Sequence, residues 1–131
     1  MIAYRMQQAD DSLNEAHILH RERAYRGAIN RAYYAMFYAL LALLATKHLG
    51  SSKHSGVIAL FDREFVKPGI FSKNMSKSIR IAFENRQDHD YGEFVELDDE
   101  NSDEMIQMAE RFITSIRDYL VKEGFMNTVD E

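Results

Sequence analysis

The chain has 131 residues, of which 46% are hydrophobic and 28% charged, a composition typical of one globular domain with a buried core. It has no cysteine, which excludes disulfides and thiolate metal sites and fits a reducing, cytoplasmic location. We find no signal-peptide pattern, and the apolar run at residues 32–46 is too short to span a bilayer. The net charge of −5 argues against non-specific DNA binding.

The first predicted helix spans Ile2 to about Arg21, because apolar or small residues recur there every three or four positions. The second, Ala24–Gly50, is apolar nearly all round, as expected of a central buried helix, and Gly50 predicts a left-handed cap. Its small residues form a stripe that lets another helix approach closely, either within the bundle or across a dimer interface. These residues are Ala28, Ala32, Ala35, Ala39 and Ala42.

A third helix follows the turn at residues 51–55, whose serines predict a side-chain cap, and it ends at Pro68-Gly69. A fourth helix begins near Lys73, and residues 91–98 are predicted to form a loop.

The fifth helix starts in the acidic run at residues 98–104 and ends at Gly124, leaving 125–131 as a frayed tail. No stretch alternates like a strand. We therefore predict an all-α domain over residues 1–124, an antiparallel up-and-down four-helix bundle with an additional short helix.

Charge is unevenly spread along this chain. Residues 1–90 carry 13 Lys/Arg and 9 Asp/Glu, whereas residues 91–131 carry 3 and 12. A mildly basic body joined to an acidic C-terminal segment leaves room for a local anion site, although a solvated acidic helix also explains the pattern.

Arg86 is the most informative residue, because it continues the inward-facing stripe of the fourth helix, where a guanidinium needs a partner. It can pair with Asp90 one turn later, or grip a phosphate at the mouth of the bundle. His89 lies three residues further on. It can act as a general acid or base beside a bound phosphate, or serve as a solvated helix end.

Two polar residues interrupt the second helix. Asn30 falls among tyrosines and is expected to need a buried hydrogen-bond partner. Arg31 shares an edge with Tyr34 and Tyr38, on whose rings it can stack. Ligand binding and a structural contact to another helix both fit these residues.

The sequence predicts neither a metal nor a cofactor. Di-iron bundles carry Glu-x-x-His pairs on two helices, and this chain has none. His17 and His20 share a helix face, but no nearby carboxylate in the sequence completes a site. Gly-rich phosphate loops, nucleophile elbows and dinucleotide fingerprints are absent from the sequence.

Three segments together resemble a HEPN domain: NRAYYAMFYALLALL (30–44), SKHSGVIALFDREFVKPG (52–69) and ENRQDHDY (84–91). They are most similar to a small prokaryotic branch with an Asn-Arg-x-Tyr-Tyr stretch, a Lys-His turn and a late Arg-x-x-x-Asp-Tyr. The resemblance covers about Ala3–Gly124. It implies a bundle that is usually a homodimer, binds nucleotides or RNA, and often stands beside a small nucleotidyltransferase in a toxin–antitoxin pair. Many members are metal-independent endoribonucleases with an Arg-x4–6-His motif.

The resemblance carries over position by position. It implies catalytic roles for Arg86 and His89, and nucleotide or RNA binding by Asn30, Arg31, Tyr34, Lys53, His54, Arg86, Asp90 and Tyr91. The nuclease motif is not intact, because two residues rather than four to six separate Arg86 from His89. Tyr91 falls where the nuclease histidine would begin, and a phenol with a pKa of about 10 is no base near neutral pH.

We therefore expect a nucleotide- or RNA-binding component of a two-component module, with Tyr91 as the residue that a partner nucleotidyltransferase would modify. An endoribonuclease that uses Arg86 with His89 or His54 is the first alternative. A structural dimerisation module without a ligand is the second.

Overall fold

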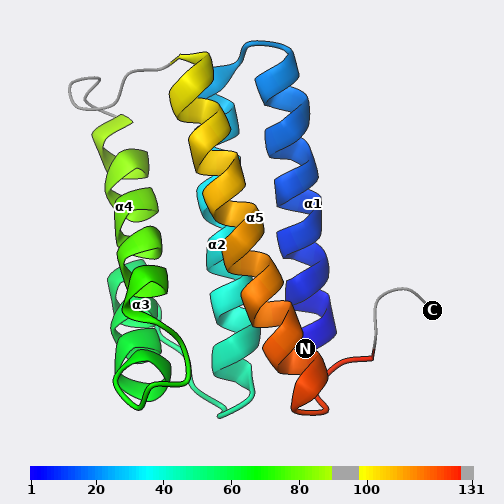
Figure 1. The fold of residues 1–131 in the computed structure, drawn as a ribbon, viewed down its shortest axis with the longest axis vertical. Helices are drawn as coiled ribbons and strands as arrows, with labels where there is room; N and C mark the ends of the chain where they lie inside the picture. The colour runs from blue at the N-terminus through cyan, green and yellow to red at the C-terminus, as the bar shows by residue number, and fades with distance from the viewer. Residues whose placement is uncertain (90–97, 128–131) are drawn as a thin grey trace.

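The computed structural model describes residues 1–89 and 98–127, and all regular secondary structure in these ranges is helical. The predicted all-α bundle is thus confirmed (Figure 1). In chain order the elements are α1 (Ile2–Arg21), α2 (Tyr25–Ala45), α3 (His54–Phe61), the π-helical turn η1 (Asp62–Val66), α4 (Lys73–His89) and α5 (Asp99–Lys122).

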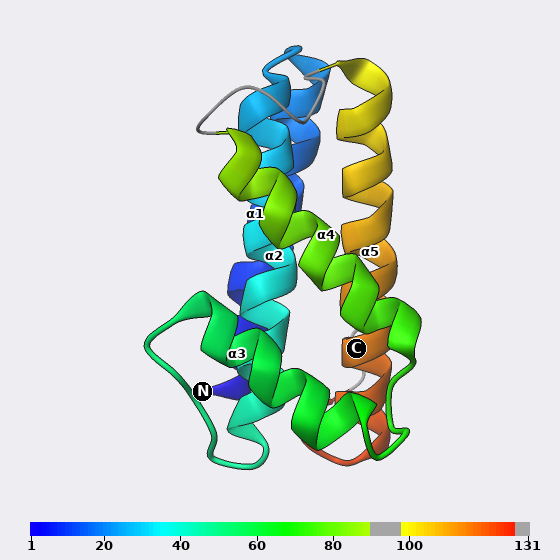
Figure 2. The ribbon, with the colours of Figure 1, turned by 90° about the vertical axis from the view of Figure 1, so that its left-hand side faces the viewer.

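Helix α2 is the centre of the bundle, because α1, α3, α4 and α5 all pack against it (Figures 1 and 2). With 21 residues, α2 is long and apolar enough to span a bilayer. The sequence did not predict this, because its apolar run at residues 32–46 is shorter than the helix. However, 67% of its most apolar window is buried inside the protein, as in the core helix of a bundle.

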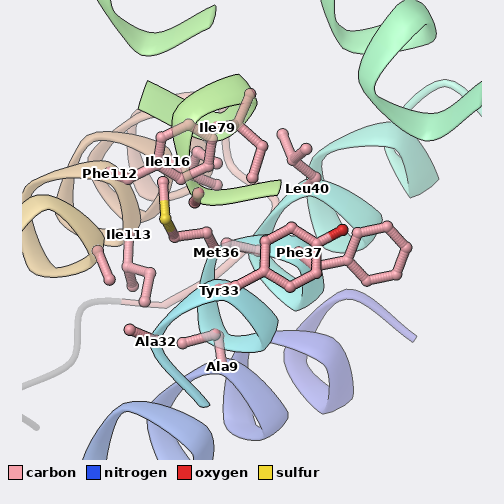
Figure 3. Packing of buried hydrophobic residues seen from close by; sticks show 14 of the residues in the cluster. Ala9, Ala32, Tyr33, Met36, Phe37, Leu40, Ile79, Phe112, Ile113 and Ile116 are labelled. Carbon is pink, nitrogen blue, oxygen red and sulfur yellow. The ribbon is translucent and has the colours of Figure 1, made fainter. Parts of the chain in front are cut away.

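The small-residue stripe of α2 is buried within one chain. All five of its alanines are fully buried, and the close-up of the core shows Ala32 facing Ala9 of α1 (Figure 3). Alanine on both helices lets α1 and α2 pack closely along their length. Of the two predicted roles for the stripe, the intrachain one is confirmed.

The predicted end of the second helix at Gly50 is wrong. Helix α2 ends at Ala45, and His48 takes the left-handed conformation with a φ of 56°. The N–H of Leu49 then donates to the carbonyl of Leu44 at 3.0 Å, which closes the helix. The Thr46 hydroxyl donates to the carbonyl of Leu43 at 2.6 Å and occupies a second terminal carbonyl.

The predicted side-chain cap before the third helix is also wrong. Lys53 is the N-cap of α3, with extended backbone and no side-chain hydrogen bond to the helix, while its own N–H donates to Ser51 Oγ at 3.2 Å. This turn folds tightly over the helix start: a Cβ on Gly56 would lie 2.9 Å from Cβ of Ser51. Glycine at position 56 therefore lets the turn place His54 on the first turn of α3.

The predicted ends of the fifth helix are confirmed. The Asp98 side chain accepts a hydrogen bond from the N–H of Asn101 at 2.8 Å, which caps α5. At the other end Gly124 has a φ of 84°, and the N–H of Phe125 donates to the carbonyl of Leu120 at 2.8 Å. Most of the predicted 91–98 loop and the end of the predicted tail lie outside the described residues.

Candidate functional site

A buried tyrosine and a histidine form the base of the candidate site. Tyr33 of α2 is fully buried, and its hydroxyl lies 2.7 Å from Nδ1 of His54. Burial raises the pKa of Tyr33 strongly, so the phenol keeps its proton. A buried hydroxyl proton needs an acceptor, and Nδ1 is the one within reach. This hydrogen bond assigns the proton of a neutral imidazole to Nε2.

His54 is held as a neutral ring. Burial lowers its pKa, and the positive charge of Arg86 lowers that pKa further. The imidazole stacks on Phe37 of α2, with the ring centroids 4.0 Å apart and an interplanar angle of 22°. At neutral pH the site therefore presents an uncharged Nε2–H donor rather than an imidazolium.

Arg86 lies over the same aromatic surface. Its guanidinium carbon is 5.1 Å from the ring centroid of Tyr33 and 5.2 Å from that of Phe83, which positions it by cation–π contact. Its Nε is buried and has no hydrogen-bond partner among the described side chains. Among the side chains that the structure describes, residues 1–86 and 98–127, no carboxylate pairs with this guanidinium. The proposed partner Asp90 lies outside the described residues.

The structure brings together three of the predicted site residues: Tyr34, His54 and Arg86. Tyr34 meets His54 edge to face, with centroids 5.8 Å apart at 82°. Lys53 is exposed and precedes His54 at the start of α3. The predicted site did not include the rings on which the site is built, Tyr33, Phe37 and Phe83.

Arg31 meets the site only through the ring of Tyr34, and its polar contacts tie α2 to α1. One of its terminal nitrogens donates to the Ser12 hydroxyl at 2.6 Å. Its Nε lies 3.1 Å from a Glu15 carboxylate oxygen, an ion pair in which the N–H does not point at the oxygen. The predicted stacking on Tyr34 is confirmed, with the guanidinium 5.4 Å from the ring centroid.

Two other predicted residues are not brought into the cluster by any contact that the structure describes. Asn30 is half-buried, and its side chain forms no hydrogen bond with any side chain that the structure describes, so the expected partner is not found there. His89 is the last residue of α4, but its side chain lies outside the described part of the chain, as does all of Tyr91.

The other two histidines that the sequence singled out lie on the α1–α5 side of the molecule. His17 Nε2 is 2.8 Å from Glu110, and His20 contacts both the Ser102 hydroxyl at 2.9 Å and Asp99 at 3.5 Å. Neither acidic partner was visible from the sequence, since both lie on a helix about 80 to 90 residues away. Across the described residues, no three potential ligands of this kind gather around one point.

Comparison with known proteins places this arrangement in a family. The HEPN domain model matches residues 2–119, which is most of the chain. The chain belongs to the HEPN family. It is 44% identical over 116 residues to a "UPF0332 protein" of Thermotoga maritima, with 88% of each chain covered.

Two further relatives of this HEPN chain come from Methanocaldococcus jannaschii. One, named "Putative toxin MJ0142", is 31% identical over 121 residues, covering 92% of this chain and 82% of its own. The other, named "Putative toxin MJ0605", is 36% identical over 109 residues, covering 83% and 81%. The family predicted from the Asn30–Leu44, Ser52–Gly69 and Glu84–Tyr91 segments is thus confirmed.

Proposed function

We propose that this HEPN domain binds the phosphate of a nucleotide or RNA between Arg86 and His54, as one component of a toxin–antitoxin-like module. The observation that carries the proposal is the guanidinium of Arg86, which is fixed on two rings and has no acid among the described residues. Relatives with toxin in their names support the module, and a nucleotidyltransferase is the partner that we propose for it.

The energetics of Arg86 favour an anionic ligand. A half-buried guanidinium whose Nε has no acceptor loses hydration without regaining a hydrogen bond, at a cost of about 1–3 kcal/mol. A phosphate oxygen bound at the terminal nitrogens would supply the missing negative charge beside this group. Two flat rings beneath the guanidinium, Tyr33 and Phe83, leave its donor edge as the part able to meet a ligand.

The hydrogen bond to Tyr33 favours binding over proton transfer at His54. Because Nδ1 accepts the phenol proton, the free nitrogen Nε2 carries a hydrogen and can donate to a phosphate oxygen. A general base needs a free lone pair, which this tautomer does not offer to a ligand. Arg86 and His54 together thus supply a charged donor and a neutral donor, which suits recognition of a phosphodiester.

A metal-independent endoribonuclease is the second candidate, and one observation favours it. Burial and the charge of Arg86 lower the pKa of His54, so the imidazole is neutral at pH 7 and able to accept a proton, and it lies beside Arg86 although the Arg-x4–6-His spacing is absent. Exchange of the imidazole proton from Nε2 to Nδ1 would then be required before Nε2 accepts a proton from a 2'-hydroxyl.

One experiment tests the proposal and separates the two candidates. Binding of AMP and of a mixed-sequence RNA is measured for the wild type, for Arg86→Gln and for Arg111→Gln, which removes an exposed arginine from α5 as a matched control. We expect Arg86→Gln to weaken binding about tenfold or more, because a hydrogen bond from a charged group is worth about 1.5–3 kcal/mol. Equal affinities for all three proteins would refute the site.

The same samples, together with His54→Gln, are incubated with RNA in EDTA to test for cleavage. Cutting that is lost in both Arg86→Gln and His54→Gln establishes the nuclease. Binding without cutting establishes the recognition module. If Arg86→Gln binds normally but unfolds at lower urea, the guanidinium serves only the bundle, which is the structural alternative.

The proposed partners have separate tests. We propose that the chain forms a homodimer in the cytoplasm, and light scattering would measure the mass of that dimer. We also propose that a small nucleotidyltransferase co-purifies with the chain when both are expressed together. Transfer of a nucleotide to the chain, lost in Tyr91→Phe and detected by mass spectrometry, would identify Tyr91 as the modified residue.

A further inference from the structure

Helix α4 carries a row of cations beyond the Arg86 site. Lys73, Lys77 and Arg80 are spaced four and three residues apart, so they lie on one side of the helix, and all three are exposed. Together with Lys67, just after η1, they line a groove of about 660 Å³ between η1 and α4. Figure 2 faces this side of the molecule, where α4 runs obliquely across the view.

The acids in this groove leave most of that charge free. Asp62 accepts hydrogen bonds from Ser76 Oγ at 2.6 Å and from Arg80, so its charge is already matched. Lys67, Lys73 and Lys77 form no ion pair with any residue that the structure describes. Residues 53–86 carry seven Lys/Arg against three Asp/Glu, although the whole chain has a net charge of −5. The groove itself is lined by four cations, Lys67, Lys73, Lys77 and Arg80, against two acids, Asp62 and Glu84.

The groove adjoins a hollow that reaches Phe83, on whose ring Arg86 lies. A second hollow of about 210 Å³ shares Arg80 and Glu84 with the groove and is also lined by Ser55 and Phe83. Ser55 follows His54 in the chain, and Phe83 is one of the two rings beneath Arg86. From Lys73 to Arg86 the helix rises about 20 Å, at 1.5 Å per residue. That length exceeds what a single nucleotide phosphate needs.

We propose that this row, made up of Lys67, Lys73, Lys77 and Arg80, is a track for the backbone of single-stranded RNA that leads past Phe83 to Arg86 on the neighbouring side of α4. The inference rests on the proposed function, since it takes one phosphate of the strand to be held at Arg86. Lysines are mobile point charges that suit a flexible phosphodiester chain without reading its sequence. A positive groove that leads to stacked aromatic rings is the usual arrangement for binding single strands.

The salt dependence of binding tests the track directly. Affinity for an oligouridylate of about 12 nucleotides, a length within the usual range of single-strand sites, is measured over a series of salt concentrations. Three proteins are compared: the wild type, a double variant that carries Lys73→Gln and Lys77→Gln (the track variant), and a second double variant that carries Arg111→Gln and Lys122→Gln (the α5 control). The α5 control removes the same charge from exposed positions on α5. Because each phosphate contact to a single strand contributes about 0.7 to the slope of log affinity against log salt, the track variant should have a slope shallower by about 1.4. The control should keep the wild-type slope.

In a second measurement, the affinity of the same proteins and of Arg86→Gln for a dinucleotide is determined. This ligand is too short to leave the Arg86 site, so the track variant should bind it as tightly as the wild type does, whereas Arg86→Gln should lose affinity for both ligands. If the track variant and the α5 control have the same slope on the long strand, the track is refuted while the Arg86 site stands. That result would assign the lysines to another partner, such as an acidic protein surface. If the wild type binds neither ligand, both the track and the proposed function fail.

Discussion

The arginines on the two sides of this bundle have different partners. Where α1 meets α5 and α2, the guanidinium groups reach carboxylates: both Asp10 oxygens lie within 2.7 Å of Arg117, and Glu15 lies 3.1 Å from Arg31. Where α4 meets α2 and α3, Arg86 lies on the rings of Tyr33 and Phe83 and meets no acid that the structure describes.

This contrast separates a structural charge from an available one. A paired guanidinium joins two helices and has its charge matched by a carboxylate, although the Nε atoms of Arg31 and Arg117, like that of Arg86, have no hydrogen-bond partner among the described residues. A guanidinium held by ring contact alone keeps its donors for a ligand. The difference is testable, because stability should depend on the paired side and ligand affinity on the unpaired side.

The largest expected effect on stability comes from replacing an arginine on the paired side, and we compare it with the same replacement on the unpaired side. Arg117→Gln breaks the contact between α5 and α1 and leaves Asp10 without its partner. Since both side chains are partly exposed, we expect a loss of about 1–2 kcal/mol in the free energy of unfolding. Arg86→Gln should change it by less than about 0.5 kcal/mol, because lost ring contact is offset by removal of the buried, unpaired Nε.

Urea unfolding measures both changes, and RNA binding by the same proteins completes the comparison. Arg117→Gln should bind RNA like the wild type. If instead Arg86→Gln proves the more destabilised of the two, the division between a structural and an available charge is wrong.

Tyr33→Phe is expected to have a smaller effect, of about 1 kcal/mol in the free energy of unfolding, through loss of one buried hydrogen bond. The substitution also frees Nδ1 of His54, so the imidazole is no longer restricted to one tautomer. Nitrogen-15 chemical shifts of the His54 ring report this: Nε2 should be the protonated nitrogen in the wild type, and a mixture should appear in the variant. A wild-type ring protonated at Nδ1 would contradict our assignment.

The pH dependence of stability gives a third test, of smaller size. Since the pKa of His54 is lower in the folded protein than in the unfolded chain, the unfolded chain binds the proton more readily. This group therefore lowers the free energy of unfolding as the pH falls from about 7 towards 5, through the ordinary histidine pKa of about 6.5.

The difference between wild type and His54→Gln isolates that contribution from the other titrating groups. In Arg86→Gln the pKa of His54 should rise, because one of its two causes of depression is removed. A proton NMR titration of the ring measures the shift. A pKa that stays the same in Arg86→Gln would mean that the two groups do not sense each other's charge.

Periodicity alone was enough to predict the bundle. α1, α5 and the burial of α2 were visible as apolar residues at helical spacing, and the acidic run and Gly124 marked the ends of α5. The end of α2 was not predictable in this way. His48 takes the left-handed position because the chain turns there towards α3, and glycine preference pointed to Gly50 instead.

The candidate site was predicted only in part, for a related reason. Arg86 stood out because a charge on an apolar stripe is unexpected in any context. Tyr33 and Phe83 gave no such signal, since an aromatic residue on a buried face is normally core, and Tyr33 acts through an imidazole 21 residues away. His54 was recognised from the family motif, but its partnership with Arg86 depends on how α3 and α4 pack, which no local pattern encodes.

The smallest expected effect belongs to the histidines of the paired side. His17→Gln removes the contact to Glu110, in which both side chains are roughly two-fifths exposed. Exposed pairs of this kind contribute only about 0.2–1 kcal/mol, because water already solvates both partners and salt screens them. We expect a loss at the lower end of that range in urea unfolding at about pH 6, and no change in RNA affinity. A loss of affinity here would show that the α1–α5 side also contacts the ligand, and the contrast between the two sides would then be one of degree.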